Sequence, residues 1–140
     1  MSLITTRSRY GLRLLVELAE RGMAQAIDLG SVARRQDIPE LYLSKLATPL
    51  KAAGILRSER GAKGGYRLAR RPEDITVLDV VEALEGRSSL LECTGEPGAC
   101  VRSGECKTLP IWSGLDKVIQ DYLRGISLAD AAGAAIDYTI

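Results

Sequence analysis

The sequence contains no histidine and no phenylalanine, and aromatic residues make up only 4% of its 140 residues. Because histidine is absent, neither a Ser-His nor a Cys-His catalytic pair can form. A phosphate-binding loop that ends in Gly-Lys-Ser or Gly-Lys-Thr is also missing. A redox enzyme would need a closer pair of cysteines than this chain offers. We therefore expect that the protein is not an enzyme.

Long hydrophobic runs are missing as well. No apolar run reaches the roughly 18 residues that cross a bilayer, and residues 1–7 have no apolar core of the kind found in signal peptides. These absences predict a cytoplasmic protein with no membrane partner, in which the three cysteines do not form a disulfide framework. A core without phenylalanine must use Leu, Ile, Val and Ala, which favours a mainly α fold.

Charge is distributed unevenly along the chain. Residues 1–71 contain 14 Lys and Arg against 6 Asp and Glu, a balance of +8, whereas residues 72–140 contain 5 against 12, a balance of −7. A basic half joined to an acidic half indicates a polyanion-binding module carried by a module of another kind. Chance clustering on solvated surfaces is the alternative.

Hydrophobic periodicity predicts three helices in the basic half. The first covers residues 8–22, where Gly22 can end it. The second follows Asp28, whose side chain can cap it. The third covers residues 39–53 and begins at Pro39, a favourable first position. Pro49 removes a backbone hydrogen bond within the third helix, so we expect a kink there or an earlier end.

Two short strands are predicted next, over residues 55–59 and 66–68, and the glycines between them favour a hairpin. In the acidic half, Thr76 to Asp79 resembles a capping box that opens a helix to about Leu84. Residues 87–107 have the composition of a loop. A helix over residues 109–124 and a short helix that starts at Ser127 complete the chain.

The order of three helices, strand, glycine-rich turn and strand predicts a winged helix-turn-helix with a small β wing. Such a fold places the third of these helices in the major groove of DNA and its wing beside the flanking phosphates. On the third helix the groove-facing set is Ser44, Lys45 and Thr48, with Glu40 near the base edges. The wing offers four cations, of which only some can face DNA because strand side chains alternate: Arg57, Arg60, Lys63 and Arg67.

Four segments of the sequence resemble the Rrf-two family of winged helix-turn-helix transcriptional regulators, of the IscR, NsrR and CymR type. They are Ile38-Pro39 with Tyr42-Leu43, the run over residues 50–56, the wing signature over residues 58–69, and Ile75 to Val81. The resemblance extends from Leu3 to about Ala131. It implies sequence-specific binding to double-stranded DNA by a homodimer on a near-palindromic operator.

The resemblance also implies that the helix containing Trp112 and Leu115 pairs with its copy in the dimer. Independently, the apolar stripe of this helix is wide enough to cover more than one surface, and packing within one chain is the alternative. The expected domains are therefore a DNA-binding domain over residues 1–86, a cysteine-bearing sensor loop over 87–107, and a C-terminal dimerisation helix with its tail over 108–140.

Cys93, Cys100 and Cys106 lie in a segment whose glycines and proline would let it wrap a metal cluster, and thiolates are the usual ligands of iron–sulfur clusters. The resemblance implies a two-iron or four-iron cluster on these three residues. Zinc fits less well, because structural zinc sites favour four ligands and close cysteine pairs. A clusterless thiol switch stays open, since reversible oxidation needs no fourth ligand.

The fourth ligand of such a cluster is not identified by the sequence. Family members use a histidine shortly after the third cysteine or a side chain from the first helix of the other subunit. In this sequence Leu109 lies near the place of that histidine, and Ser8 and Arg9 lie near the place of the ligand on the first helix. The remaining candidates are a small exogenous ligand or a nearby carboxylate: Glu92, Glu96 or Glu105.

These observations lead to one functional hypothesis. The protein is a dimeric transcriptional regulator, acting as a repressor, that senses iron–sulfur, redox or nitric oxide status through its three-cysteine loop. Cluster status would favour one spacing of the two recognition helices, and only the spacing that matches the half-sites binds well. The alternative is a clusterless regulator controlled by thiol oxidation or by a protein partner.

Overall fold

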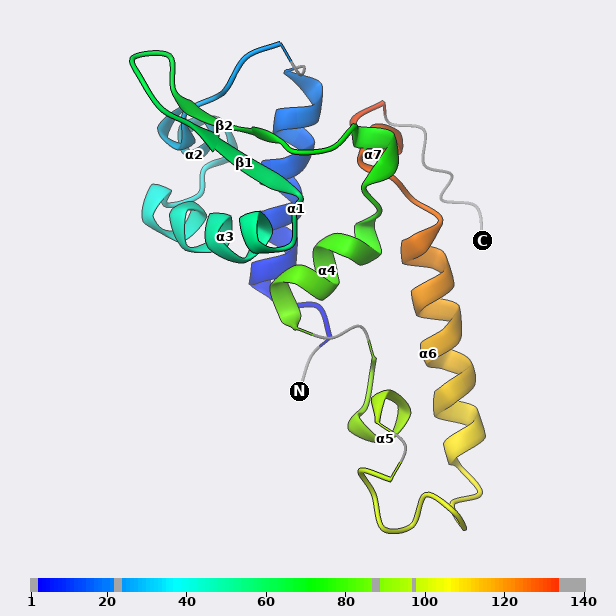
Figure 1. The fold of residues 1–140 in the computed structure, drawn as a ribbon. Coiled ribbons are helices and arrows are strands. Elements are labelled where there is room, and N and C mark those ends of the chain that lie inside the picture. Colours follow the sequence, from blue (N-terminus) through cyan, green and yellow to red (C-terminus); the bar gives the residue numbers. More distant parts are fainter. Residues whose placement is uncertain (1–2, 22–23, 87–88, 97, 134–140) are drawn as a thin grey trace.

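A computed structural model describes residues 3–21, 24–86, 89–96 and 98–133. Its elements follow the chain in this order: α1 (Thr6–Glu20), α2 (Leu29–Gln36), α3 (Glu40–Ala52), β1 (Leu56–Glu59), β2 (Gly65–Leu68), the 3-10 turn η1 (Pro72–Asp74), α4 (Val77–Glu85), α5 (Glu92–Gly95), α6 (Leu109–Arg124) and α7 (Leu128–Ala132). The predicted mainly helical fold with a two-stranded wing is confirmed. In Figure 1, α1, α2, α3 and the hairpin form one body, from which α6 and α5 extend away. Within the described residues, none of the helices could span a bilayer.

Side-chain caps explain where several helices begin. The Asp28 carboxylate accepts a hydrogen bond from the backbone N–H of Ser31 at 2.8 Å, as predicted. Thr76 and Asp79 form the predicted reciprocal capping box at the start of α4. The helix α1 begins two residues earlier than expected, because Thr5 caps it by accepting from the N–H of Arg7 at 3.1 Å. Its predicted end at Gly22 lies outside the described residues, and α1 ends at Glu20.

The helix α3 continues past Pro49 to Ala52, so the expected earlier end is wrong. Proline deprives the Lys45 carbonyl of its helical partner. The loss is offset because Leu46, Ala47 and Leu50, which surround this turn on its inner side, are all at least 99% buried. Packing of the apolar face therefore overrides the local cost of proline.

Two hydrophobic clusters hold the elements together. The larger one joins α1, α2, α3, the hairpin, α4 and α7. The smaller one joins Leu3, Val77 and Val81 to Ile119 and Leu123 on one face of α6. The second half of α6 is thus packed against α4.

The segment after α6 returns to the larger cluster. Leu128 of α7 is completely buried in it, and its N–H donates to the carbonyl of Ile75 at 2.9 Å. The N–H of Val77 donates to the carbonyl of Ile126 at 2.8 Å. These two bonds tie both ends of the linker between α6 and α7 to the start of α4.

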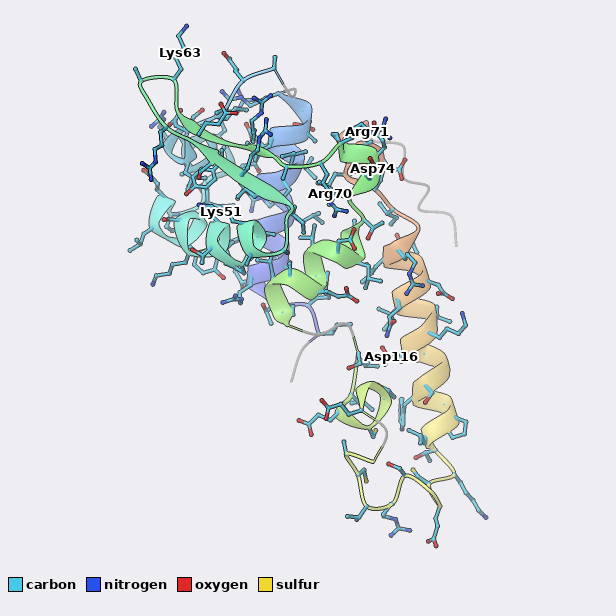
Figure 2. The ribbon with its side chains drawn as sticks, in the orientation of Figure 1. Lys51, Lys63, Arg70, Arg71, Asp74 and Asp116 are labelled. Carbon is cyan, nitrogen blue, oxygen red and sulfur yellow. The ribbon has the colours of Figure 1, made fainter. Side chains whose placement is uncertain are left out.

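A buried carboxylate on α6 joins this helix to the segment before α5. The side chain of Asp116 is 3% exposed and accepts a hydrogen bond from the N–H of Leu90 at 2.9 Å. In Figure 2 Asp116 lies on the side of α6 that faces this segment. The start of the cysteine loop is therefore fixed to the middle of α6.

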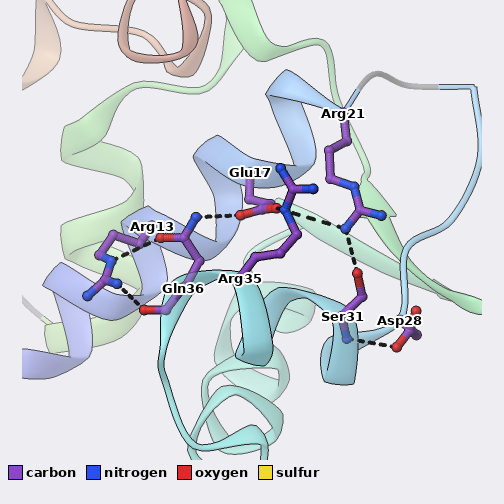
Figure 3. Close-up of polar contacts among 7 residues, drawn as sticks. All are labelled: Arg13, Glu17, Arg21, Asp28, Ser31, Arg35 and Gln36. Atoms are coloured by element: carbon purple, nitrogen blue, oxygen red, sulfur yellow. Dashed lines mark hydrogen bonds and ion pairs between the residues drawn. The ribbon is translucent and has the colours of Figure 1, made fainter.

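A second buried carboxylate, Glu17 of α1, joins the first two helices (Figure 3). Its side chain is 2% exposed and forms an ion pair with Arg35, and it accepts a hydrogen bond from Gln36. Arg21 lies 3.9 Å from the same carboxylate and donates to the hydroxyl of Ser31 at 2.8 Å. A buried charge is tolerated only where it is paired in this way, so the network fixes α2 against α1.

Glu85, at the end of α4, holds the first turn of α1. Its Oε1 accepts from the N–H of Thr5 at 3.0 Å, from the Thr5 hydroxyl at 2.7 Å and from the Ser8 hydroxyl at 2.6 Å. Burial opposes ionisation of this carboxyl, but the hydrogen bonds from Ser8 and Thr5 outweigh it and hold the pKa of Glu85 below its ordinary value. The first helix of the body and the helix that leads to the cysteine loop are thereby joined.

Candidate nucleic-acid interface and cysteine loop

The outer face of α3 carries an exposed stripe at helical spacing. Ser44, Lys45 and Thr48 are all exposed, while Leu43 and Leu46 face the core. The predicted groove-facing residues therefore share one solvent-facing side of the helix.

Leu41 extends this stripe toward the start of α3, and sequence reasoning missed it. Its side chain is 70% exposed. It lies three residues before Ser44, so the helical period itself could have placed it on the stripe. A leucine at this position presents methyl groups where a recognition helix enters the groove.

The Glu40 carboxylate rests beside α2. A Cβ atom on Gly30 would lie 3.3 Å from Glu40 Oε2, 3.2 Å from Asp28 Oδ2 and 3.4 Å from Arg34 Nη1. Gly30 is thus surrounded by charged side-chain tips at the start of α2. The expected approach of Glu40 to a base edge stays a prediction.

The hairpin is attached to the body by an isolated residue that sequence reasoning missed. Ile27 donates from its N–H to the carbonyl of Tyr66 at 2.9 Å and accepts from the N–H of Tyr66 at 2.8 Å. Leu56 and Leu68, which face each other across the two strands, are buried beneath the hairpin. A single apolar residue between two helices carries no strand pattern, so only the pairing in space identifies it.

The four predicted wing cations occupy two different environments. Arg60 and Lys63 are exposed at the turn, and Lys63 projects from its tip in Figure 2. Arg67 Nη1 lies 2.8 Å from Glu59 Oε1, and Arg57 Nη2 lies 3.8 Å from the same oxygen. The hydrogen bond from Arg67 is the main reason that the pKa of Glu59 lies below its ordinary value.

The three cysteines lie in one segment but in different surroundings. Cys93 and Cys106 are half-buried, Cys100 is exposed, and all three are free thiols. Cys93 belongs to α5, a helical turn inside the segment expected to be a loop. The turn forms because the Thr94 hydroxyl accepts from the N–H of Leu91 at 3.2 Å and donates to its carbonyl at 2.8 Å.

No three Cys, Asp or Glu side chains in the described part of the chain lie close enough together to form a metal-ligand set. The donor chemistry of three thiols matches iron, but the structure does not bring them together. Glu92, Glu96 and Glu105, the candidate fourth ligands, are all exposed.

Cys106 differs from an ordinary exposed thiol. Its Sγ lies 3.3 Å from Thr108 Oγ1. The hydrogen bonds from the Thr108 side chain, from the Thr108 backbone and from the Leu109 backbone hold the pKa of Cys106 below its ordinary value, and the charge of Arg102 acts in the same direction. The thiolate is the form that ligates metal and reacts with oxidants.

The α6 helix has apolar residues on two faces, and the described residues cover only one of them. Ile119 and Leu123 pack in the smaller cluster. The residues of the other face remain between 41% and 65% exposed: Ile111, Trp112, Leu115, Val118 and Tyr122. Packing within one chain therefore explains only half of the wide apolar stripe.

Residues 4–134 match the family model of Rrf2, which is described as an iron-dependent transcriptional regulator. The chain belongs to the Rrf2 family. The protein rrf2 of Nitratidesulfovibrio vulgaris is 43% identical over 127 residues, which cover 91% of this chain and 85% of that protein. Membership of the Rrf2 family makes the chain a DNA-binding transcriptional regulator and not an enzyme, as expected.

Solved structures of Rrf2-type regulators share this fold. CymR, the global cysteine regulator of Bacillus subtilis, superposes with a TM-score of 0.77 at 33% identity, covering 96% of this chain and 98% of CymR. IscR of T. potens superposes with a TM-score of 0.73 at 33% identity, covering 98% of this chain and 90% of IscR. The helical body with its wing is therefore the fold of known Rrf2-family regulators.

Gly65 provides a test of the wing attachment in this Rrf2-family protein. Its φ is +151°, and an added Cβ would lie 2.4 Å from the carbonyl oxygen of Ile27. We expect Gly65→Ala to lower the free energy of unfolding by about 1–3 kcal/mol more than Gly61→Ala, because overpacking adds to backbone strain. Gly61 is the matched control, with a φ of +108° and no atom within 4 Å of its Cβ position. Urea unfolding measures both variants, and an equal loss of unfolding free energy in Gly65→Ala and Gly61→Ala would contradict the close contact with Ile27.

Proposed function

We propose that this chain is a dimeric, sequence-specific repressor that acts in the cytoplasm and senses iron–sulfur, redox or nitric oxide status through its three-cysteine loop. The observation that carries the DNA-binding part is the exposed stripe on α3 beside a wing whose tip presents Arg60 and Lys63. Neither of these two side chains forms an ion pair or hydrogen bond within the described part of the chain. Both are therefore available to phosphates.

The stripe of α3 supplies the contacts in the major groove. Ser44 and Thr48 can donate to or accept from base edges, and Lys45 can reach a phosphate or a guanine. Leu41 adds an apolar contact of the kind that recognises a thymine methyl group. The wing places Arg60 and Lys63 at the flanking phosphates, while Arg57 and Arg67 add positive charge to the same side.

A second copy of the chain covers the exposed face of α6. Five large apolar side chains on one side of a 16-residue helix form a surface that a monomer would leave in water. A two-fold pairing through this helix would relate the two copies of α3 by the symmetry that a near-palindromic operator requires.

The cysteine loop connects α4 to α6, and this position supports a sensing role. Cys93, Cys100 and Cys106 are the residues that would hold an iron–sulfur cluster, and the family description as iron-dependent favours iron. A bound cluster would supply a group that is gained or lost with iron supply and oxidants. The bond from Leu90 to Asp116 gives any reordering of the loop a direct contact with α6.

A clusterless thiol switch is the second candidate function, and one observation on the loop favours it. The lowered pKa of Cys106 increases its thiolate fraction, which is the form that reacts with oxidants. The similarity to a global cysteine regulator adds support. In this version a reversible disulfide, or a protein partner bound to the loop, would take the place of the cluster.

Removal of Arg60 tests the DNA-binding proposal. Arg60→Ala should weaken binding to an operator selected from random sequences. The slope of log K against log salt should also become shallower by about one, because one phosphate contact is lost. The measurement is a fluorescence-anisotropy titration between 50 and 200 mM salt. Arg71→Ala is the control, since Arg71 is exposed, lies outside the wing and pairs with Asp74 at 3.0 Å. Equal effects of both variants would refute the placement of the wing.

Dimerisation through α6 predicts that Val118→Glu produces a monomer. Val118 is 65% exposed, so the added charge is harmless in one chain but would be buried in the dimer. Sedimentation velocity should give a mass close to the 15.1 kDa of one chain. A DNA titration of the same variant should show a large loss of operator affinity. Ser113→Glu, which adds the same charge beside the polar residues Asp116 and Lys117, should remain dimeric. A wild-type protein that is monomeric at tens of micromolar would refute the proposal.

The cluster proposal predicts iron in protein that is purified without oxygen. Wild-type protein should show a visible absorption band and bound iron, and changing Cys93, Cys100 and Cys106 to Ala should abolish both. Single Glu92→Gln, Glu96→Gln and Glu105→Gln variants identify a carboxylate ligand, because only the ligand variant should lose iron. A colourless, iron-free wild type whose cysteines form a reversible disulfide would instead support the thiol switch.

A further inference from the structure

One carboxylate stands among the cations of the wing. Glu59 ends β1, while Arg57 and Arg67 face each other across the two strands. Residues two apart on a strand share a face, so all three side chains lie on one side of the hairpin. Glu59 Oε1 is 2.8 Å from Arg67 Nη1 and 3.8 Å from Arg57 Nη2.

We infer that Glu59 is a positioning residue that holds Arg67 and Arg57 on the wing and thereby limits the sequence-independent affinity of the protein for DNA. This inference rests on the proposed function. It assigns the four wing cations to two roles. The exposed pair at the turn, Arg60 and Lys63, contacts phosphates, whereas Arg57 and Arg67 on the strands share one carboxylate of the same hairpin, which offsets one of their two positive charges.

The exposure of the three side chains supports this division. Arg67 is only 20% exposed, whereas Glu59 is 37% exposed and Arg57 is 56% exposed. A phosphate that approaches this face meets the Glu59 carboxylate as well as the guanidinium groups. Arg67 can bind that phosphate only by giving up its hydrogen bond to Glu59, so the net gain from the new contact is small.

The carboxylate also has a role within the hairpin, which the test must separate. Two arginines directly opposite each other repel, and such pairs destabilise a two-stranded sheet. Glu59 relieves this repulsion by pairing with both. A purely structural role would change the stability of the wing but would not steepen the salt dependence of DNA binding.

Sequence-independent binding depends almost entirely on the number of phosphates that the protein neutralises. Removing the Glu59 charge should therefore leave the wing with one more positive charge for the phosphates and change the slope of log K against log salt by about −0.9. In practice, Glu59→Gln should bind DNA more tightly than the wild type at 50 mM salt, and this advantage should shrink about threefold by 200 mM.

The experiment uses the full chain and a 30-base-pair duplex of random sequence, so no operator needs to be known. Fluorescence anisotropy gives the affinity at a series of salt concentrations for wild type, Glu59→Gln and Glu73→Gln. The control removes an equal charge from Glu73, which pairs with Arg71 at 3.5 Å outside the wing. The inference is supported if Glu59→Gln, and not Glu73→Gln, binds the duplex more tightly than the wild type and with a steeper dependence of affinity on salt. No change, weaker binding, or an equal gain in both variants overturns it.

A double-mutant cycle keeps the inference testable if Glu59→Gln loosens the hairpin. Arg67→Gln alone should weaken DNA binding, because it leaves the Glu59 charge facing the phosphates. The Glu59→Gln, Arg67→Gln double variant removes the pair without changing the net charge of the wing, so its affinity should lie within about twofold of the wild type. A double variant that keeps the gain of Glu59→Gln overturns the inference. Failure of the wild type to bind any duplex at 50 mM salt would instead refute the proposed function.

Discussion

Burial of the apolar face of α1 is the interaction on which the rest of the structure depends. Leu14 and Leu15 are completely buried and Leu18 is 98% buried. This face lies in the cluster that also contains the inner residues of α2, α3, the hairpin, α4 and α7. Burial of one leucine contributes roughly 1.5–3 kcal/mol, whereas the net stability of such a domain is only about 5–15 kcal/mol, so the loss of any one of these side chains would be a large perturbation.

The polar contacts of α1 determine how its neighbours are placed. Glu17 fixes α2 through Arg35 and Gln36, and the ring of Tyr10 meets the ring of Tyr42 on α3 edge-on at 5.6 Å. At its other end, the first turn of α1 is bonded to Glu85 of α4. One helix therefore positions both α3 and the helix that leads to the cysteine loop. Side chains held by packing and hydrogen bonds in this way would suit direct readout of bases if α3 is the recognition helix, as proposed.

Periodicity and capping chemistry predicted most of the fold, because both depend on residues close in sequence. The stripe of Ser44, Lys45 and Thr48, the Asp28 cap and the capping box at Thr76 are all of this kind. The contacts that were not predicted join residues far apart. The pairing of Ile27 with Tyr66 requires the hairpin to be in place, and the burial of Glu17 requires cations from α2.

The same distinction applies to the candidate site. The sequence identified four wing cations by their charge, but only the strand register shows that Arg57 and Arg67 share a carboxylate. Leu41 was missed because only polar residues were considered for the outer stripe of α3. The turn at α5 depends on one hydroxyl of Thr94, which is too weak a signal to override loop composition. Cation counts thus overestimate the charge that a wing presents to DNA.

Under the proposed function, the cysteine loop would need only modest free energy to control DNA binding. A hundredfold change in operator affinity corresponds to about 2.7 kcal/mol of coupling between the loop and the DNA-binding surface. A buried hydrogen bond to a charged group contributes about 1.5–3 kcal/mol, and the bond from Leu90 to Asp116 is of this type. Because α6 would also form the dimer contact, a loop rearrangement that breaks or strengthens this bond would act on the spacing of both recognition helices. Control can therefore operate through the position of α6 while the helical body that reads DNA stays unchanged.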